Sequence, residues 1–238
     1  MPTRLYVIAI SNSAAAGAAM VAHKRIPHRL VRLMPGLHPL LVRLAGFDGF
    51  TVPALEMDGQ KVQGSRRIAR FLDEVRPDPP LFPAEPERRA QAEEAERWGE
   101  QVLQPVPRRL FRYLLLTSEP ARIWMGTEVM HIPASRVMVV CFMPAIRRLA
   151  QISRADEAHV REDIARLPEL LDHADGLIED GTIGSSEPNA ADFQILASVA
   201  VLRAFVDLGR QLRGRPCEAA ARQLYPDWPS IPSSLPAG

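Results

Sequence analysis

Residues 51–65, which read TVPALEMDGQKVQGS, carry the strongest fold signal in the chain. Asp58-Gly59 separates two short runs of strand-forming residues, and an Asp-Gly pair in that position is a strong local signal of a β-hairpin. Val52-Pro53 stands just before the hairpin. Gly64-Ser65 follows it and ends the strand pattern.

The segment after the hairpin is predicted to be a helix that runs from Ser65 through Val75. Ile68, Phe71, Leu72 and Val75 recur at i, i+3, i+4 and i+7, which places them on one face of a helix. The hydroxyl of Ser65 is placed to cap this helix.

The N-terminal residues predict a strand, a helix and a second strand. Leu5–Ile10 is a continuous apolar run, as expected of a buried strand. Ser11–Ser13 offers N-caps for a helix over Ala14–Lys24, and His28–Met34 alternates like a strand. A strand-helix-strand order implies a right-handed parallel crossover.

The pattern changes after residue 76. Residues 76–86 hold five prolines in eleven residues and predict an extended connector. Beyond it the patterns are helical, over 87–117, 134–153, 156–180, 189–208 and 215–224. Asn189 and Asp192 form a capping box before the apolar run Phe193–Leu208, which predicts a central helix. We therefore predict an α/β domain over 1–76, a linker over 77–86 and an all-helical domain over 87–238.

Composition excludes several classes of protein. The chain has 238 residues, 47% of them hydrophobic, and 29 Lys+Arg against 28 Asp+Glu, a balance that argues against nucleic acid as a partner. Two cysteines cannot form a disulfide framework, and the histidines show no metal-ligand spacing. Gly17 interrupts the Ala-rich stretch Ala14–Ala22, which is too short and too weakly apolar to span a membrane. We expect a cytoplasmic protein with no metal.

The order of elements, with Val52-Pro53 before the hairpin and Ser65 after it, resembles the glutathione S-transferases. It is most similar to the theta-like, serine-type branch. The resemblance extends over both predicted domains and implies a thioredoxin-like N-terminal half. The box at Asn189 and Asp192 matches the family's cap on its central helix. The family implies glutathione, or another low-molecular-weight thiol, as co-substrate, and a homodimer as the assembly.

The resemblance implies roles for residues near the first strand. Ser11 falls where serine-type enzymes keep the hydroxyl that activates the thiol, although Ser13 can take that role instead. Asn12 matches a polar contact to glutathione. His38 lies in a stretch similar to the family's Gly-x-His segment, whose histidine contacts the glycine carboxylate.

The resemblance also covers the hairpin region. Val52 and Pro53 match the cis-proline turn that pairs with the cysteinyl unit, and Ser65 matches the serine that binds the γ-glutamyl carboxylate. Gly64 stands among these binding residues where the family usually has Glu or Gln. This difference removes a partner for the γ-glutamyl amine.

The chemistry asked of Ser11 is physically reasonable. A free thiol has a pKa of about 8.5, so little thiolate exists at neutral pH. A hydroxyl at a helix N-terminus stabilises the anion by a hydrogen bond and by the helix dipole. Lowering the pKa by about 2 units requires roughly 2.7 kcal/mol, within reach of one charge-assisted bond and the dipole.

The helical half offers weaker signals for a second substrate. Trp98 and Gln101 lie on a helix expected to border the cleft between the domains, although Trp98 can equally be a core aromatic. Arg108-Arg109 and Arg112-Tyr113 are interpreted as a solvated face, with an anionic substrate as the alternative. Cys217 is predicted to lie on a helix or at the surface, without a redox role.

These observations predict a transferase-like enzyme that adds a thiolate to a small apolar electrophile bound between the domains. Detoxification is the corresponding biological role in the family. One alternative is thiol-assisted isomerisation or lysis of a small metabolite. Another is a non-catalytic ligand-binding protein on the same scaffold, which Gly64 favours.

Overall fold

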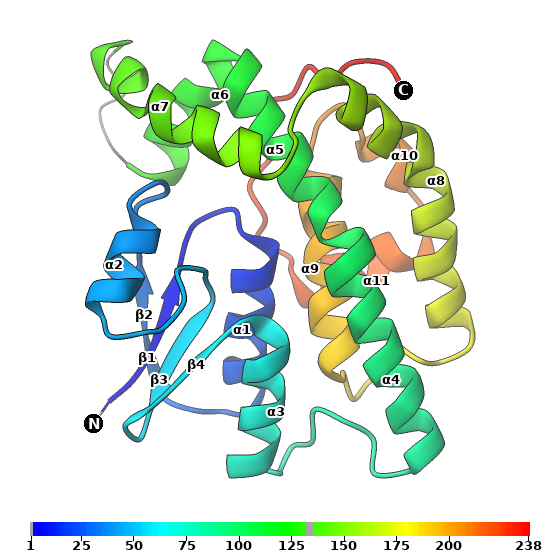
Figure 1. The fold of residues 1–238 in the computed structure, drawn as a ribbon. Helices are drawn as coiled ribbons and strands as arrows, with labels where there is room; N and C mark the ends of the chain where they lie inside the picture. Colours follow the sequence, from blue (N-terminus) through cyan, green and yellow to red (C-terminus); the bar gives the residue numbers. More distant parts are fainter. Residues whose placement is uncertain (1, 132–135) are drawn as a thin grey trace.

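The computed structural model describes residues 2–131 and 136–238, with the side chains of 136–141 left out. Figure 1 shows a sheet flanked by helices, in blue and cyan, beside a helical part in green to red. The predicted fold class, a thioredoxin-like part followed by a helical part, is confirmed. Within the described residues, no helix combines the length and the hydropathy needed to cross a bilayer.

The N-terminal part contains a four-stranded sheet in the order β2-β1-β3-β4. β1 pairs with β2 in parallel and with β3 in antiparallel fashion, and β3 pairs with β4 as a hairpin. The elements in chain order are β1 (Thr3–Val7), α1 (Asn12–His23), β2 (His28–Arg32), α2 (His38–Leu44), β3 (Ala54–Met57), β4 (Gln60–Gln63) and α3 (Ser65–Val75).

The predicted hairpin and crossover are both present. Asp58 and Gly59 both have positive φ, 50° and 82°, as a type I′ turn requires. The Val52–Pro53 peptide bond is cis.

Two elements differ from the sequence prediction. The first strand ends at Val7, and residues 8–10 leave the sheet as a loop. The prediction contained no helix at His38–Leu44, but the structure forms α2 there, with Pro39 in its first turn.

Helices cover the two faces of the sheet unequally. The larger core packs α1 and α3 against one face, through residues such as Leu5, Leu55 and Ile68, all fully buried. A smaller cluster on the other face joins Tyr6 and Ala54 to the α2 segment. The edge strand β2 is largely exposed.

The helical part surrounds α9. Its elements are α4 (Pro86–Trp98), the π-helical η1 (Gly99–Leu103), α5 (Pro105–Thr117), α6 (Glu119–Trp124), the π-helical η2 (Met125–Val129), α7 (Arg136–Ile152), α8 (Glu157–Glu179), α9 (Ala190–Ala204), α10 (Gly209–Leu212) and α11 (Pro216–Leu224). Nearly every side chain of α9 is buried, and the predicted capping box at its start is present. α9 is therefore the central helix, as the sequence predicts.

The connector between α3 and α4 is held against the fold. Lys24 is 4% exposed, and its Nζ donates to the Asp73 carboxylate at 3.0 Å and to the Arg76 carbonyl at 2.6 Å. The same carboxylate accepts the Leu81 N–H at 2.7 Å. Leu81 in turn accepts a hydrogen bond from the Ala190 N–H at the start of α9.

Buried amides join the two parts of the molecule. Asn12 Nδ2 donates to the Gln104 carbonyl and to Ser198 Oγ, both at 3.1 Å. Gln194 Nε2 donates to Gln104 Oε1 at 2.6 Å. These bonds connect α1, the start of α5 and α9, and they fix how the sheet packs on the helical part.

Candidate functional site

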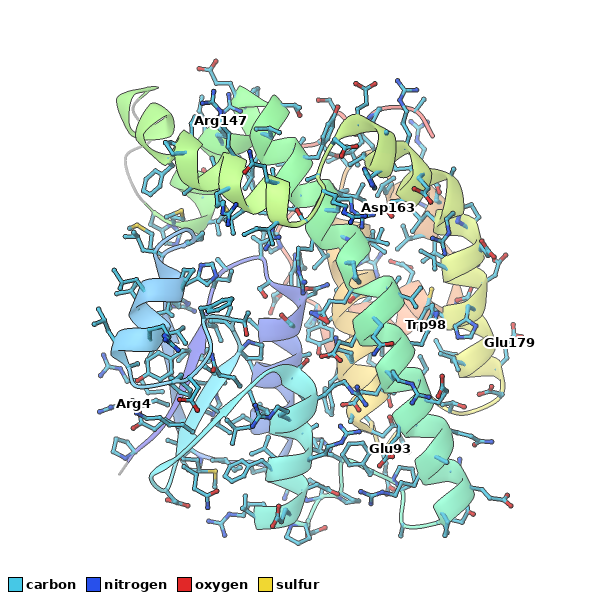
Figure 2. The ribbon with its side chains drawn as sticks, in the orientation of Figure 1. Arg4, Glu93, Trp98, Arg147, Asp163 and Glu179 are labelled. Atoms are coloured by element: carbon cyan, nitrogen blue, oxygen red, sulfur yellow. The ribbon has the colours of Figure 1, made fainter. Side chains whose placement is uncertain are left out.

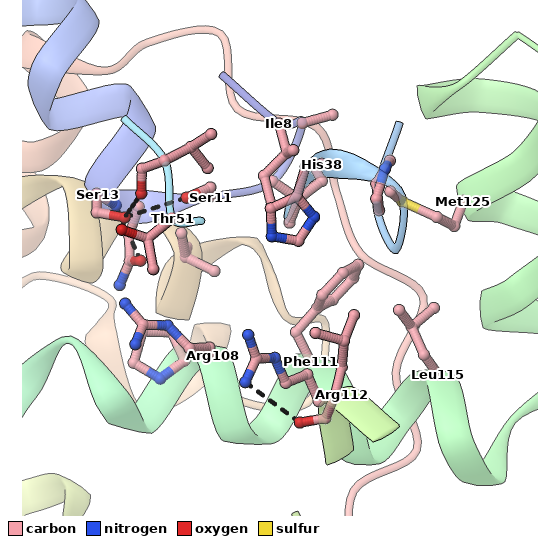
Figure 3. A pocket seen from close by; sticks show the side chains of 18 residues that line it. Ile8, Ser11, Ser13, His38, Thr51, Arg108, Phe111, Arg112, Leu115 and Met125 are labelled. Carbon is pink, nitrogen blue, oxygen red and sulfur yellow. Dashed lines mark hydrogen bonds between the residues drawn. The ribbon is translucent and has the colours of Figure 1, made fainter. Parts of the chain in front are cut away.

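A cavity of about 180 Å³ lies where the sheet part meets α5. Its lining comes from the loop after β1, the first residues of α1, the start of α2, the turn before β3 and one face of α5 (Figure 3). The residues that line it are Ile8, Ala9, Ile10, Ser11, Asn12, Ser13, Pro35, His38, Thr51, Val52, Pro107, Arg108, Phe111, Arg112, Leu115, Met125, Leu149 and Val201. Four of the sequence-predicted site residues, Ser11, Asn12, His38 and Val52, therefore share one cavity.

Two hydroxyls meet at the N-terminus of α1. Ser11 is the N-cap, and its Oγ accepts the Ala14 N–H at 3.3 Å. Ser11 Oγ lies 3.2 Å from Ser13 Oγ, and Ser13 Oγ donates to the Val52 carbonyl at 3.4 Å. With the Ser13 hydrogen on Val52, the Ser11 hydrogen points to Ser13 or to a ligand. The geometry therefore makes Ser11 the available donor and Ser13 its support.

The loop after β1 brings Ser11 to the cavity. Ile10 has φ 57°, a left-handed conformation that is unusual for a β-branched residue. The Ile10 side chain packs against the core of the helical part. This contact holds the reversal that ends the strand and starts α1 at the cavity.

The cis turn borders the cavity, and the α3 residues lie behind it. Val52 lines the cavity, and its N–H has no hydrogen-bond partner among the described residues. The Gly64 N–H donates to the Pro53 carbonyl at 2.9 Å. Pro53, Gly64 and Ser65 do not line the cavity themselves.

The predicted cap at Ser65 is wrong. Gly64 occupies the N-cap position with φ 87°, and α3 begins at Ser65 itself, with no side-chain capping bond. Ser65 is only 2% exposed. A positive φ suits glycine at position 64, where a Glu or Gln would be strained.

His38 is buried at the first position of α2, with 8% of its surface exposed. Its Nδ1 is buried and has no hydrogen-bond partner among the described residues. Burial, and secondarily the nearby Arg112 cation, lower the pKa of His38. The imidazole is therefore neutral at pH 7 and keeps unused hydrogen-bonding capacity at the cavity.

The side chain of Asn12 has no free N–H for a thiol ligand. Both bonds of its Nδ2 go to the helical part, and its Oδ1 accepts the Ser13 N–H at 3.0 Å. The predicted contact to glutathione therefore has no unused N–H to make it. The amide instead ties α1 to α9.

The sequence interpretation placed Arg108 and Arg112 on a solvated face. The structure contradicts this. Both are half-buried and line the cavity from α5. Burial lowers the pKa of Arg108, and burial together with the Arg108 cation lowers the pKa of Arg112 to about 10. Both guanidinium groups remain cationic at pH 7.

Trp98 and Gln101 do not line this cavity. Trp98 ends α4 on the side that faces α8, where its ring centroid lies 4.3 Å from that of His173 (Figure 2). Gln101 is exposed and borders a separate hollow with Arg109 and Asp163. The α4–η1 stretch thus directs these side chains away from the sheet part, and the pocket role predicted for them has no support in their position.

Thr51 and Phe111 line the cavity but were not predicted as site residues, and a binding role for Arg112 was only the alternative to a solvated face. The signal available in the sequence is the spacing on α5, since Arg108 and Arg112 are four residues apart and share a face. That spacing alone does not say whether the face meets water or a second domain.

Cys217 lies on α11, the helix position that the sequence analysis offered beside a surface one, and it is fully buried. Burial, reinforced by Asp175, raises the pKa of its thiol to about 12. This thiol is not a nucleophile at neutral pH. In the part of the chain that the structure describes, no cluster of His, Cys, Asp and Glu has the arrangement of a metal site.

Comparisons with known proteins agree on the fold. A family model described as the N-terminal domain of glutathione S-transferase matches residues 5–80. Poplar glutathione transferase F1 is similar in structure, with a TM-score of 0.65 at 17% identity over 97% of this chain and 95% of that one. The beta-etherase LigF from Sphingobium sp. strain SYK-6 has a TM-score of 0.60 at 21% identity, with 97% of each chain covered. Maleylpyruvate isomerase from Pseudomonas aeruginosa PAO1 has a TM-score of 0.55 at 18% identity, over 92% of this chain and 89% of that one. No curated protein matches the sequence significantly.

A small sheet with a cis-proline turn, joined to a helical part, defines a two-part thioredoxin-like protein. Residues 5–80 match the model of the N-terminal domain of the glutathione S-transferase family, and the whole chain has the fold of solved glutathione transferases. Membership of the theta-like, serine-type branch stays a prediction.

Proposed function

We propose that the protein is a thiol transferase that uses glutathione, or a related small thiol, and that the Ser11 hydroxyl stabilises the thiolate. The observation that carries this proposal is the pair Ser11 and Ser13 beside Val52 in one cavity. Cys217, the cysteine whose side chain the structure describes, is buried and protonated, so it does not supply the reacting thiol.

The thiol fits between two kinds of group. The Ser11 hydroxyl and the N-terminus of α1 supply positive potential to a sulfur anion. The free N–H of Val52 is available to a peptide-like ligand laid along the cis turn. Gly64 lacks the carboxylate or amide that usually holds the γ-glutamyl amine, so we expect weaker glutathione binding than the family pattern supports.

The experiment is to measure the pKa of bound glutathione by the ultraviolet absorbance of the thiolate in wild type, Ser11→Ala, Ser13→Ala and the control Ser186→Ala. Calorimetry in the same buffer gives the affinity. Wild type should lower the thiol pKa by 1 to 2 units from about 8.5. Ser11→Ala should abolish most of that shift, Ser13→Ala should abolish a smaller part, and Ser186→Ala at an exposed position should leave the shift unchanged.

A clear negative exists for this proposal. If wild type does not bind glutathione at millimolar concentration, glutathione is excluded as the thiol. If it binds glutathione with an unshifted thiol pKa, the role of Ser11 is excluded.

The second candidate is thiol-assisted isomerisation or ether cleavage, in which the thiol is regenerated. Similarity of fold to a maleylpyruvate isomerase and to a beta-etherase favours including it. Titrating free thiol during turnover separates the two, since a transferase consumes one thiol for each product. A non-catalytic ligand-binding role would be favoured if Ser11→Ala leaves every ligand affinity unchanged and no turnover is found.

We further propose that the protein is a cytoplasmic homodimer with a role in detoxification. We expect no nucleic acid or membrane partner. Family resemblance and the near-neutral charge support it. Light scattering measures the oligomeric state directly.

A further inference from the structure

The side chains that line the cavity beside Ser11 include cationic groups and no anionic ones. Arg108 and Arg112 are four residues apart on α5, and Figure 3 shows both side chains rising from that helix toward Ser13, Thr51 and His38. None of the residues that line the cavity is an Asp or a Glu. The cavity is therefore cationic at neutral pH.

Neither arginine forms a direct ion pair within the described residues, and the carboxylate of Glu100, which acts on Arg108 through space, is bonded to Arg66 instead. Arg112 donates to the backbone carbonyl of Leu149 at 3.2 Å, and Arg108 makes no hydrogen bond or ion pair at all. The arginine between them shows the contrast, since Arg109 donates to both oxygens of Asp163 at 2.6 Å. A half-buried cation without an anion is unfavourable, and a bound anion would relieve that cost.

His38 adds a third polar group at the same place. Its buried Nδ1 has no partner among the described residues, and the residue is more than nine-tenths buried. A neutral imidazole can donate one N–H to an anion that two guanidinium groups already attract. Because Arg112 and His38 interact electrostatically, the three groups act on one small volume.

The remaining walls are apolar. Ile8, Phe111, Leu115 and Met125 surround the polar groups. A cavity of about 180 Å³ with such walls suits a small organic molecule more than a free inorganic ion. The planar guanidinium fork matches a carboxylate in shape and charge.

We propose that this cavity binds a small organic carboxylate, with its charge held by Arg108 and Arg112 and its apolar body against Phe111. This names the class of second substrate for the transferase proposed above and so rests on that proposal. It replaces the expectation of a purely apolar electrophile. Binding is measured without any thiol, so the two proposals can fail separately.

The test uses calorimetry with matched acid and amide pairs, namely propionate with propionamide, benzoate with benzamide, and trans-cinnamate with cinnamamide. Each pair has one apolar body and differs in charge. Wild type should bind at least one acid about tenfold more tightly than its amide. Arg108→Gln and Arg112→Gln should each remove most of that preference.

The control variant is Arg67→Gln, which removes the same charge from an exposed position on α3. It should leave the acid preference within twofold of wild type. Retained binding of the amides in the two cavity variants shows that the cavity is still folded.

Two results overturn the proposal. The first is equal or absent binding of acids and amides by wild type in all three pairs. The second is an unchanged acid preference in both cavity variants. If those variants also lose glutathione binding, the arginines hold the thiol's own carboxylate instead. An acid preference without glutathione binding would support the carboxylate site and reject the transferase.

Discussion

Replacing Asn12 by alanine should weaken the junction between the sheet part and the helical part. The change removes the two hydrogen bonds from Nδ2 to the Gln104 carbonyl and to Ser198 Oγ, both at 3.1 Å and both buried. Each such bond contributes about 1 kcal/mol net. Part of the desolvation cost of the Gln104 carbonyl is added, so we expect the free energy of unfolding to fall by about 2 to 3 kcal/mol.

The assay is urea unfolding followed by circular dichroism and tryptophan fluorescence. Trp98, Trp124 and Trp228 are the three tryptophans, so fluorescence reports on the helical part, whereas circular dichroism reports on both parts. In wild type the two transitions should coincide if unfolding is cooperative. In Asn12→Ala they should shift to lower urea and can separate, because the shared contact is weakened.

The control is Gln60→Ala, which removes an amide from an exposed residue of β4. It should change stability by less than about 0.5 kcal/mol. A double-mutant cycle with Ser198→Ala should give a coupling free energy of about 1 kcal/mol. A stability loss below about 0.5 kcal/mol for Asn12→Ala would refute the assignment of Asn12 to the junction.

Three further predictions concern buried groups. Lys24→Met should lower the free energy of unfolding by about 3 kcal/mol in urea melts, because its carboxylate partner on α3 loses a buried cation, whereas Lys61→Met at the surface should be nearly neutral. In a Cys141→Ser variant, Cys217 is the one remaining cysteine. The native variant should not react rapidly with an aromatic disulfide reagent, because burial keeps the Cys217 thiol protonated. Rapid release of one equivalent of the aromatic thiol would contradict this. The lowered pKa of His38 keeps the imidazole neutral in the folded state, while the unfolded chain takes up a proton below pH about 6.5, so the free energy of unfolding falls as the pH drops. His38→Gln should therefore lose less stability than wild type between pH 7 and pH 5. Equal dependence of stability on pH in the two proteins would argue against a buried neutral imidazole.

Local patterns predicted the sheet part well because its signals are short-range. Asp58-Gly59 specifies a turn by its own backbone conformation, and the apolar spacing after Ser65 predicts α3 over the observed range. The helix α2 was missed because a seven-residue helix with four leucine or valine side chains has little periodicity, and its stability comes from packing on the sheet.

The site was predicted only in part, since it forms where the two parts of the molecule meet. Ser11 and His38 were predicted through the resemblance to the glutathione S-transferases, and the structure places both at the cavity. The roles of Arg108, Arg112 and Trp98 depend on which face of the α4–α5 stretch meets the sheet, and this face is set by tertiary packing such as the contact between Gly99 and Ile195 on α9. A sequence pattern does not contain that information.

The distribution of lysines offers a practical handle. Lys24 and Lys61 are the two lysines of the chain, and Lys24 is enclosed by the connector. Lys61 is exposed on β4, beside the carbonyl of Ala45. Apart from the α-amino group, an amine-reactive dye or resin should therefore attach at one defined point on the sheet part. Such a dye would leave the cavity open and would report the distance to the tryptophans of the helical part by energy transfer.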